Sequence, residues 1–172
     1  MIIIDDERGK KIAELLYNAF STNGIHGRTD MPEDIMSKDM EKGSLEHIFF
    51  ITLTVSIDYQ RDAPLLWESA RRTFEDQRTR YLFNPERLHE ESFTKMVDDM
   101  QKYKLSKKPQ KDAKIWRTVG VTFYKKWQGD PRIFLQNCSW DSLSILDHLK
   151  DKKSDYPYLC GDKIGPLWLR ML

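Results

Sequence analysis

The sequence predicts an all-α protein, a multi-helix domain, and three observations carry this prediction. Apolar residues recur at the three- and four-residue spacing of amphipathic helices along most of the chain. Helix-capping residues, often followed by proline, stand immediately before several of these stretches. No convincing run in the sequence has the alternating pattern that is typical of a half-buried strand. A length of 172 residues suits one domain, with or without an N-terminal arm.

The N-terminal part is predicted to be a helix and loop over residues 1–30, followed by a helical domain over residues 31–172. Apolar residues at helical spacing predict an amphipathic helix over residues 6–21. A polar, glycine-containing stretch then separates the two parts. A proline start signal predicts a short helix over residues 32–43.

The segment that follows is predicted to be the central helix of the core. Ser44 is a good N-cap, and residues 45–60 are apolar on nearly every side of a helix. A helix that is apolar all round is buried on all sides, so we expect other helices to pack around this one.

Later helices are predicted from the same start and stop signals. Asp62 and Asn84 each stand shortly before a proline, as an N-cap does before the first helical turn. In the helix after Asp62, Leu65 and Leu66 are expected to face inward. An amphipathic helix is expected over residues 93–100.

The second half of the chain continues this pattern. Pro109 opens a long helix that Gly129 ends, and Asp130 begins a short one. Either Ser139 or Asp141 caps the next helix. Its core residues are expected to be three leucines, Leu143, Leu146 and Leu149.

Composition and charge narrow the function classes. Hydrophobic residues make up 40% and charged residues 32% of the sequence, which is typical of a globular protein with a well-solvated surface. The formal net charge of +1 gives no overall attraction to nucleic acid or to a membrane surface, so any attraction has to come from local patches. No apolar run approaches the roughly 18 residues of a membrane span, and the N-terminus lacks a signal-peptide pattern. We therefore predict a cytoplasmic protein without a membrane partner.

The segment near the C-terminus carries the most specific functional signal. Residues 156–165 are predicted to form a tight, glycine-containing turn between two helices, with a proline in the first turn of the second helix. In such an arrangement, free N–H groups at the start of the second helix hold a DNA phosphate. Gly161, Lys163, Ile164 and Gly165 are therefore candidate DNA-binding residues.

Residues 159–168, Leu-Cys-Gly-Asp-Lys-Ile-Gly-Pro-Leu-Trp, resemble the helix-hairpin-helix of the endonuclease III-like superfamily of DNA glycosylases. The order of elements upstream is also similar. Residues 49–70 resemble the buried helix and capped helix that lie early in that family. The resemblance covers residues 44–172.

This resemblance implies that the chain binds duplex DNA in base-excision repair, where the target base is flipped into a pocket. It also implies that residues from the early helix pair help to fill the gap in the duplex, and by position these are Asp58, Tyr59 and Gln60. The alternative is that these three residues are an ordinary polar helix end.

The chain departs from the family pattern at the positions that would carry catalysis. The family's hairpin glycines are usually two apart, whereas Gly161 and Gly165 are four apart, and Lys163 takes the place of the first glycine. Leu167 stands where bifunctional members have a lysine nucleophile. The family's activating aspartate, and the iron–sulfur loop of some members, would lie beyond Leu172. The sequence therefore identifies no catalytic residue and no cofactor.

A basic stretch supports nucleic-acid binding independently of the hairpin. Residues 101–127 hold nine basic side chains, Lys107, Lys108 and Lys111 among them, against one acid, Asp112. The aromatic residues interleaved with them include Tyr103, Trp116, Tyr124 and Trp127. Such a patch attracts phosphates and makes binding depend on salt. The alternative is a solvated, lysine-rich helix face.

The sequence does not indicate a metal site or a redox-active cysteine pair. The four histidines are far apart and do not have the spacing of metal ligands. The two cysteines, Cys138 and Cys160, are expected to be buried thiols. No metal site is predicted.

Three functions remain open at this point. The first is duplex-DNA binding as a DNA glycosylase-like protein, and the second is a non-catalytic DNA-binding module. The third is a helical subunit that binds another protein. It is favoured by residues 167–172, which form an apolar helix without a cap, so that we expect either a fragment or a partner chain that covers this end.

Overall fold

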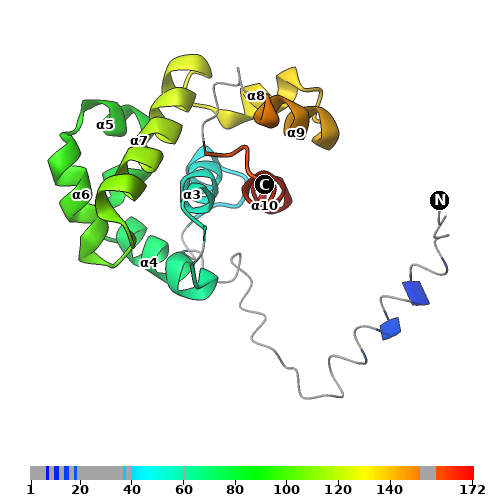
Figure 1. The fold of residues 1–172 in the computed structure, drawn as a ribbon, viewed down its shortest axis with the longest axis horizontal. Coiled ribbons are helices and arrows are strands. Elements are labelled where there is room, and N and C mark those ends of the chain that lie inside the picture. Colours follow the sequence, from blue (N-terminus) through cyan, green and yellow to red (C-terminus); the bar gives the residue numbers. More distant parts are fainter. Residues whose placement is uncertain are drawn as a thin grey trace.

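A computed structural model describes residues 7, 10, 11, 14, 15, 18, 37, 40–59, 61–151 and 158–172. Within these residues the chain is helical and has no strand, which confirms the all-α prediction (Figure 1). The division at residue 30 and the helices expected over residues 6–21 and 32–43 lie largely outside the described residues. The elements in chain order are α3 (Leu45–Ser56), α4 (Ala63–Glu75), the short 3-10 helix η1 (Arg80–Phe83), α5 (Pro85–Glu90), α6 (Phe93–Lys102), α7 (Pro109–Lys126), α8 (Pro131–Asn137), α9 (Ser142–Lys150) and α10 (Ile164–Met171).

Helix α3 is the central element of the core, as its apolar sequence predicted. Its residues from His47 to Ser56 are all buried, and α4, α7 and α10 pack against it (Figure 1). A hydrogen bond fixes the register of α10 on α3, because the Trp168 indole N–H donates to the hydroxyl of Thr52 over 2.9 Å. Helix α10 is therefore an integral part of this core.

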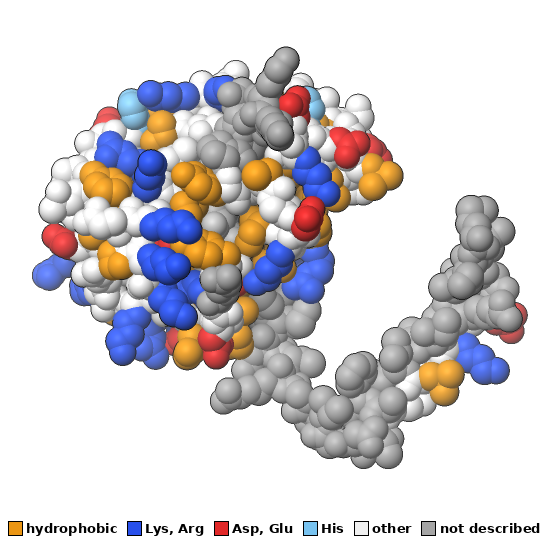
Figure 2. All heavy atoms as spheres, viewed as in Figure 1, with side chains coloured by type: hydrophobic (Ala, Val, Ile, Leu, Met, Phe, Trp, Pro, Cys, Tyr) orange, Lys and Arg blue, Asp and Glu red, His pale blue; other side chains and the backbone are white. Residues whose placement is uncertain are grey.

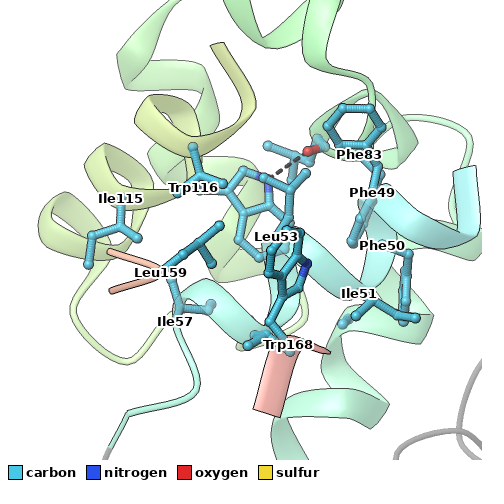
Figure 3. Close-up of a cluster of buried hydrophobic side chains, with 14 of the residues drawn as sticks. Phe49, Phe50, Ile51, Leu53, Ile57, Phe83, Ile115, Trp116, Leu159 and Trp168 are labelled. Carbon is cyan, nitrogen blue, oxygen red and sulfur yellow. Dashed lines mark hydrogen bonds between the residues drawn. The ribbon is translucent and has the colours of Figure 1, made fainter. Parts of the chain in front are cut away.

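Aromatic rings fill the space between α3, η1 and α7 (Figure 3). The rings of Phe50 and Phe83 stack with centroids 5.1 Å apart, and Trp116 meets Phe83 edge-on at 5.3 Å. The indole N–H of Trp116 donates to the carbonyl oxygen of Leu82 over 2.6 Å. Buried aromatic residues of this kind contribute a large apolar area and, through the indole N–H, a directional contact.

The capping signals in the sequence correctly located the starts of most helices. Each cap side chain accepts a hydrogen bond from a backbone N–H in the first turn of its helix, as N-cap residues do. Asp141, and not Ser139, caps α9, while Ser139 adopts a positive φ of 55° just before it. The confirmed caps are Ser44, Asp62, Asn84, Asp130 and Asp141.

Some details of the sequence-based description were wrong. Helix α3 ends at Ser56 and not at Gln60, because the chain tightens into a turn in which Asp58 N–H bonds to Val55 O and Tyr59 N–H to Ile57 O. As a result, Asp58 and Tyr59 lie beyond the end of the helix.

Two leucines expected in the core are exposed. Leu65 is 67% exposed, because the buried face of α4 runs through Leu66 and Trp67 instead. Leu143 is 70% exposed, because α9 buries Ile145 and Leu149. Cys138 is buried as expected, whereas Cys160 is exposed.

Candidate nucleic-acid interface

Three segments that are far apart in the sequence meet at one site. They are the turn after α3, the start of α7 with the loop before it, and the start of α10. The Lys163 ammonium at the start of α10 donates to the backbone oxygen of Asp58 over 3.0 Å and lies 3.3 Å from its carboxylate. The Tyr59 hydroxyl donates to the carboxylate of Asp112 in the first turns of α7 over 2.5 Å. The fold thus brings together sequence-predicted residues from all three segments, while Gln60 lies outside the described residues.

A buried carboxylate organises the site. The side chain of Asp112 is almost fully buried, and its Oδ2 accepts hydrogen bonds from the Ser106 hydroxyl and from the backbone N–H groups of Lys107 and Lys108, at 2.9, 3.0 and 3.0 Å. Its Oδ1 accepts from the Tyr59 hydroxyl. The loop that carries the two lysines is therefore held at the start of α7 by one side chain.

Arg61 joins the same network from the segment between α3 and α4. Its guanidinium donates to the carbonyl oxygen of Leu105 over 2.7 Å and lies 3.8 Å from the Asp112 carboxylate. Tyr59, Arg61, Lys107, Lys108 and Asp112 surround a small hollow of about 140 Å³. Sequence reasoning did not identify Arg61 or the organising role of Asp112. The sequence did contain one signal for Asp112, because it is the lone acid within residues 101–127.

Burial and hydrogen bonding shift the pKa values of this network. Burial raises the pKa of Tyr59 to about 12, and its hydrogen bond to Asp112 acts in the same direction, so Tyr59 remains a donor at neutral pH. Burial alone would raise the pKa of the Asp112 carboxyl. The hydrogen bonds from Tyr59, Lys108, Ser106 and Lys107 outweigh burial and hold this pKa below its usual value. Asp112 is therefore an anion at neutral pH.

Exposed lysines surround this network. Lys104, Lys107, Lys108 and Lys111 are exposed, and none of the four has a carboxylate partner within the described ranges. The ammonium of Lys111 lies 4.7 Å from the centroid of the Tyr59 ring, in a cation–π contact. We call these four lysines, together with Arg61, the basic cluster. Figure 2 shows Lys and Arg side chains gathered on the face in view, over the start of α7 and the neighbouring part of α4.

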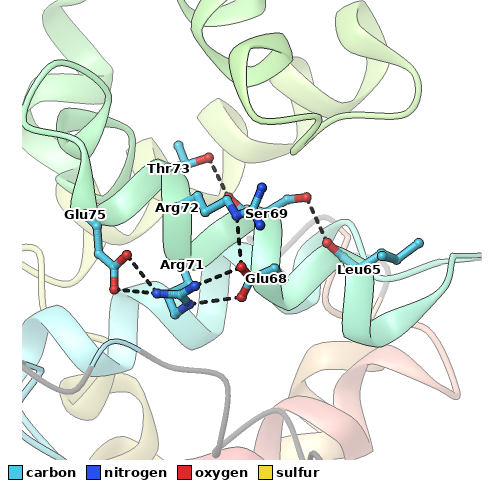
Figure 4. Close-up of polar contacts among 7 residues, drawn as sticks. All are labelled: Leu65, Glu68, Ser69, Arg71, Arg72, Thr73 and Glu75. Carbon is cyan, nitrogen blue, oxygen red and sulfur yellow. Dashed lines mark hydrogen bonds and ion pairs between the residues drawn. The ribbon is translucent and has the colours of Figure 1, made fainter.

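The cations on the outer face of α4 differ from those of the basic cluster. Arg71 forms ion pairs with Glu68 at 2.8 Å and Glu75 at 2.9 Å, and Arg72 pairs with Glu68 at 2.9 Å (Figure 4). These pairs at helical spacing balance the charge of that face, and each contributes little to stability because it is exposed. Within the described residues, the arginines of this face are therefore paired, whereas the four lysines of the basic cluster are not.

The glycine turn before α10 differs from its predicted geometry. The expectation that Gly165 presents a free N–H is wrong, because this N–H donates to the carbonyl oxygen of Gly161 over 3.0 Å. Neither glycine has a positive φ; Tyr158 adopts the left-handed conformation, with a φ of 77°. The backbone N–H groups of Asp162 and Lys163 have no acceptor within the part of the chain that the structure describes. Any contact of this turn with a phosphate would therefore be made from the exposed residues 161–163.

Gly165 and Ile164 serve packing. Both residues are buried, and a Cβ at position 165 would lie 3.0 Å from the backbone oxygen of Leu159 and 3.2 Å from Leu146. Glycine at this position allows α10 to approach α9 and the preceding turn closely. Gly161 is exposed, and an added Cβ there would have only ordinary contacts.

Lys163 lies at the site, but its charge is compensated. Its partner Asp58 is buried, with a side chain that is only 3% exposed, whereas the lysine side chain remains 61% exposed. A buried carboxylate requires such a partner. Replacing Lys163 with glutamate would therefore remove this partner, so the variant is no clean test of DNA contact.

Among the described residues, no group of three or more His, Cys, Asp and Glu side chains is placed to hold a metal ion. None of the helices described is both long and apolar enough to cross a membrane. No family model, no curated protein and no solved structure matches the chain.

Proposed function

We propose that this chain binds duplex DNA through the basic cluster, as a protein similar to the DNA glycosylases of base-excision repair. The observation that carries the proposal is the gathering of exposed, uncompensated lysines at the start of α7, next to the turn that precedes α10. Lysines of this kind neutralise backbone phosphates and release counterions, which supplies sequence-independent affinity.

The buried network under the cluster supports this function. Asp112 fixes the backbone of Lys107 and Lys108, and Tyr59 holds the turn after α3 against the same carboxylate. A phosphate-binding loop that is already ordered loses less conformational entropy on binding. The exposed turn at residues 161–163 adds backbone N–H groups beside the cluster. The proposal assigns no catalytic residue, so a non-catalytic DNA-binding module is included in it.

Fluorescence anisotropy with a labelled duplex tests the proposal. Replacing Lys107, Lys108 and Lys111 together with alanine is expected to weaken binding by at least about tenfold, since each phosphate contact contributes to affinity. The matched control is Lys125→Ala. Lys125 is an exposed lysine of the same helix, about 21 Å along its axis from Lys111. Equal affinities for the wild type, the triple variant and the control would refute the role of the cluster.

A parallel assay addresses the glycosylase part of the proposal. Duplexes that carry different damaged bases are incubated with the chain, and abasic-site formation is measured together with binding. Release of a base supports an enzyme, whereas binding without release supports the non-catalytic module.

An apolar hollow favours a second candidate function, the binding of another protein chain. It has a volume of about 430 Å³ and is lined mainly by Leu135, Trp140, Ile145, Leu169 and Leu172. Trp140 is 60% exposed beside it. Exposed apolar surface of this kind is typical of interaction sites. Sedimentation equilibrium of the chain and of its Trp140→Ala variant tests whether a second copy occupies the hollow; a wild-type chain that stays monomeric rules that occupant out.

A further inference from the structure

Another pocket lies away from the basic cluster, at the opposite end of α3. It has a volume of about 530 Å³, and its lining includes Leu45, Glu46 and Phe49 from the first turns of α3. Asp58 and the basic cluster adjoin the other end of this helix, about 18 Å away along a 12-residue axis. The pocket is therefore a separate site, and its volume lies within the roughly 300–1,000 Å³ that is typical of small-molecule sites.

The floor of this pocket is aromatic and firmly packed. Phe49, Tyr81 and Phe83 are nearly fully buried and belong to the hydrophobic core. Phe83 stacks on Phe50 at 5.1 Å, and the Tyr81 hydroxyl donates to Asp99 over 2.7 Å. These contacts fix the rings in place, so the floor of the pocket is preformed, and Leu45 and Pro85 provide its more exposed apolar surface.

The rim of the pocket is positively charged. Four cations, Arg78, Arg80, Arg87 and Lys95, line it against one acid, Glu46. Glu46 is paired with Arg80 at 2.7 Å, and Lys95 on α6 is paired at 2.6 Å with Glu91, which follows the end of α5. Within the described residues, neither the guanidinium of Arg78 nor that of Arg87 lies within ion-pair distance of a carboxylate, although the charge of Arg87 contributes to lowering the pKa of Glu91.

The backbones that carry these two arginines are held by local caps. The Arg78 N–H donates to the carboxylate of Asp76 over 2.9 Å, and the Arg87 N–H donates to the side-chain oxygen of Asn84 over 3.0 Å. The backbone turns that carry these two lining residues are therefore fixed. Arginine is the side chain best matched to phosphate, because its planar fork donates two parallel hydrogen bonds.

We infer that this pocket binds a small phosphate ester with an aromatic body, of the class of a nucleoside monophosphate. The phosphate contacts Arg78 and Arg87, and the ring fills the pocket against Leu45 and Pro85, the more exposed apolar residues of its lining. The inference is independent of the proposed DNA binding, because it involves no residue of the basic cluster.

Isothermal titration with three probes tests both halves of the inference. Adenosine monophosphate is expected to bind with a stoichiometry of one, whereas adenosine lacks the phosphate and inorganic phosphate lacks the ring. Each of these two fragments is expected to bind at least about tenfold more weakly than the nucleotide. No binding of the nucleotide, or equal binding of either fragment, would overturn the inference.

Variants locate the site. Replacing Arg78 and Arg87 together with alanine is expected to weaken nucleotide binding by about tenfold for each guanidinium removed. Replacing both with lysine keeps the charge but not the fork, so an intermediate loss is expected. Arg170→Ala, at an exposed arginine outside the pocket, is the matched control. Circular dichroism confirms that each variant is folded, and unchanged affinity in a folded double variant would contradict the assignment.

The basic-cluster variant separates this site from the DNA interface. The triple alanine variant of Lys107, Lys108 and Lys111 is expected to keep its nucleotide affinity, since none of these residues lines the pocket. A parallel loss of nucleotide binding in that variant would show that the nucleotide binds at the basic cluster, and would overturn the inference.

Discussion

Replacing Asp112 tests whether one buried carboxylate holds the candidate interface together. In the Asp112→Ala variant, four donors lose their acceptor at once: the hydroxyls of Tyr59 and Ser106 and the backbone N–H groups of Lys107 and Lys108. The guanidinium of Arg61, with a side chain only 10% exposed, also loses its carboxylate partner. Removing one partner of such a buried, charged network costs about 3–5 kcal/mol of the free energy of unfolding.

The Asp112→Asn variant separates the hydrogen bonds from the charge. An amide oxygen in the place of Oδ2 can still accept from Ser106, Lys107 and Lys108, while the amide nitrogen faces the Tyr59 hydroxyl. The cost is then expected to fall to about 1–2 kcal/mol, since the three hydrogen bonds to this oxygen remain, whereas the bond donated by Tyr59 and the negative charge are lost.

Urea unfolding followed by tryptophan fluorescence measures both variants. Asp98→Ala, at an exposed acid on α6, is the matched control and is expected to change the free energy of unfolding by less than about 0.5 kcal/mol. A cost below about 1 kcal/mol for Asp112→Ala, or equal costs for alanine and asparagine, would refute the organising role of this carboxylate.

The pKa of Asp112 is lower in the folded state than in the unfolded state, so its ionised form stabilises the fold above the unfolded pKa. This stability is lost as the pH falls through the folded pKa. In urea titrations between about pH 5 and pH 3, the wild type should therefore lose more stability than Asp112→Asn. Gly165→Ala should destabilise the chain by about 1–3 kcal/mol in the same assay, because the new methyl group would lie 3.0 Å from the backbone oxygen of Leu159, and a neutral effect would contradict the close packing of α10. Thr52→Val should lower the free energy of unfolding by about 1–3 kcal/mol, because it leaves the Trp168 indole N–H without an acceptor. Thr52→Ser keeps the hydroxyl and should lower it less; thermal unfolding measures both variants.

Local signals made most of the fold predictable. Caps such as Ser44, Asp62 and Asp141 act within one helical turn, so their chemistry can be read from neighbouring residues. The uniform apolar character of α3 likewise predicted its burial, because no other environment suits such a helix.

Features that depend on tertiary contacts could not be predicted in this way. Leu65 and Leu143 belong to segments in which two registers of apolar residues compete, and only the packing of α4 and α9 selects Trp67 and Ile145 instead. The pattern of a single sequence does not rank such registers.

In the candidate site, too, local sequence identified individual residues but not the tertiary contacts between them. Sequence reasoning selected Asp58, Tyr59 and Lys163 as separate candidates, but the contact between Asp58 and Lys163 joins residues 105 positions apart. The same contact shows that Lys163 is compensated, which its sequence position did not reveal. Tyr158 takes the strained turn conformation that the sequence assigned to glycine.

The most direct test of DNA binding is the salt dependence of duplex affinity. If Lys107, Lys108 and Lys111 each neutralise a phosphate, the logarithm of the wild-type association constant falls against the logarithm of salt concentration with a slope of about −2.7 or steeper. Replacing these three residues with alanine should make the slope shallower by about 2.7, whereas Lys125→Ala should leave it unchanged. An affinity that does not vary with salt, or a slope that the triple replacement does not alter, would contradict the account.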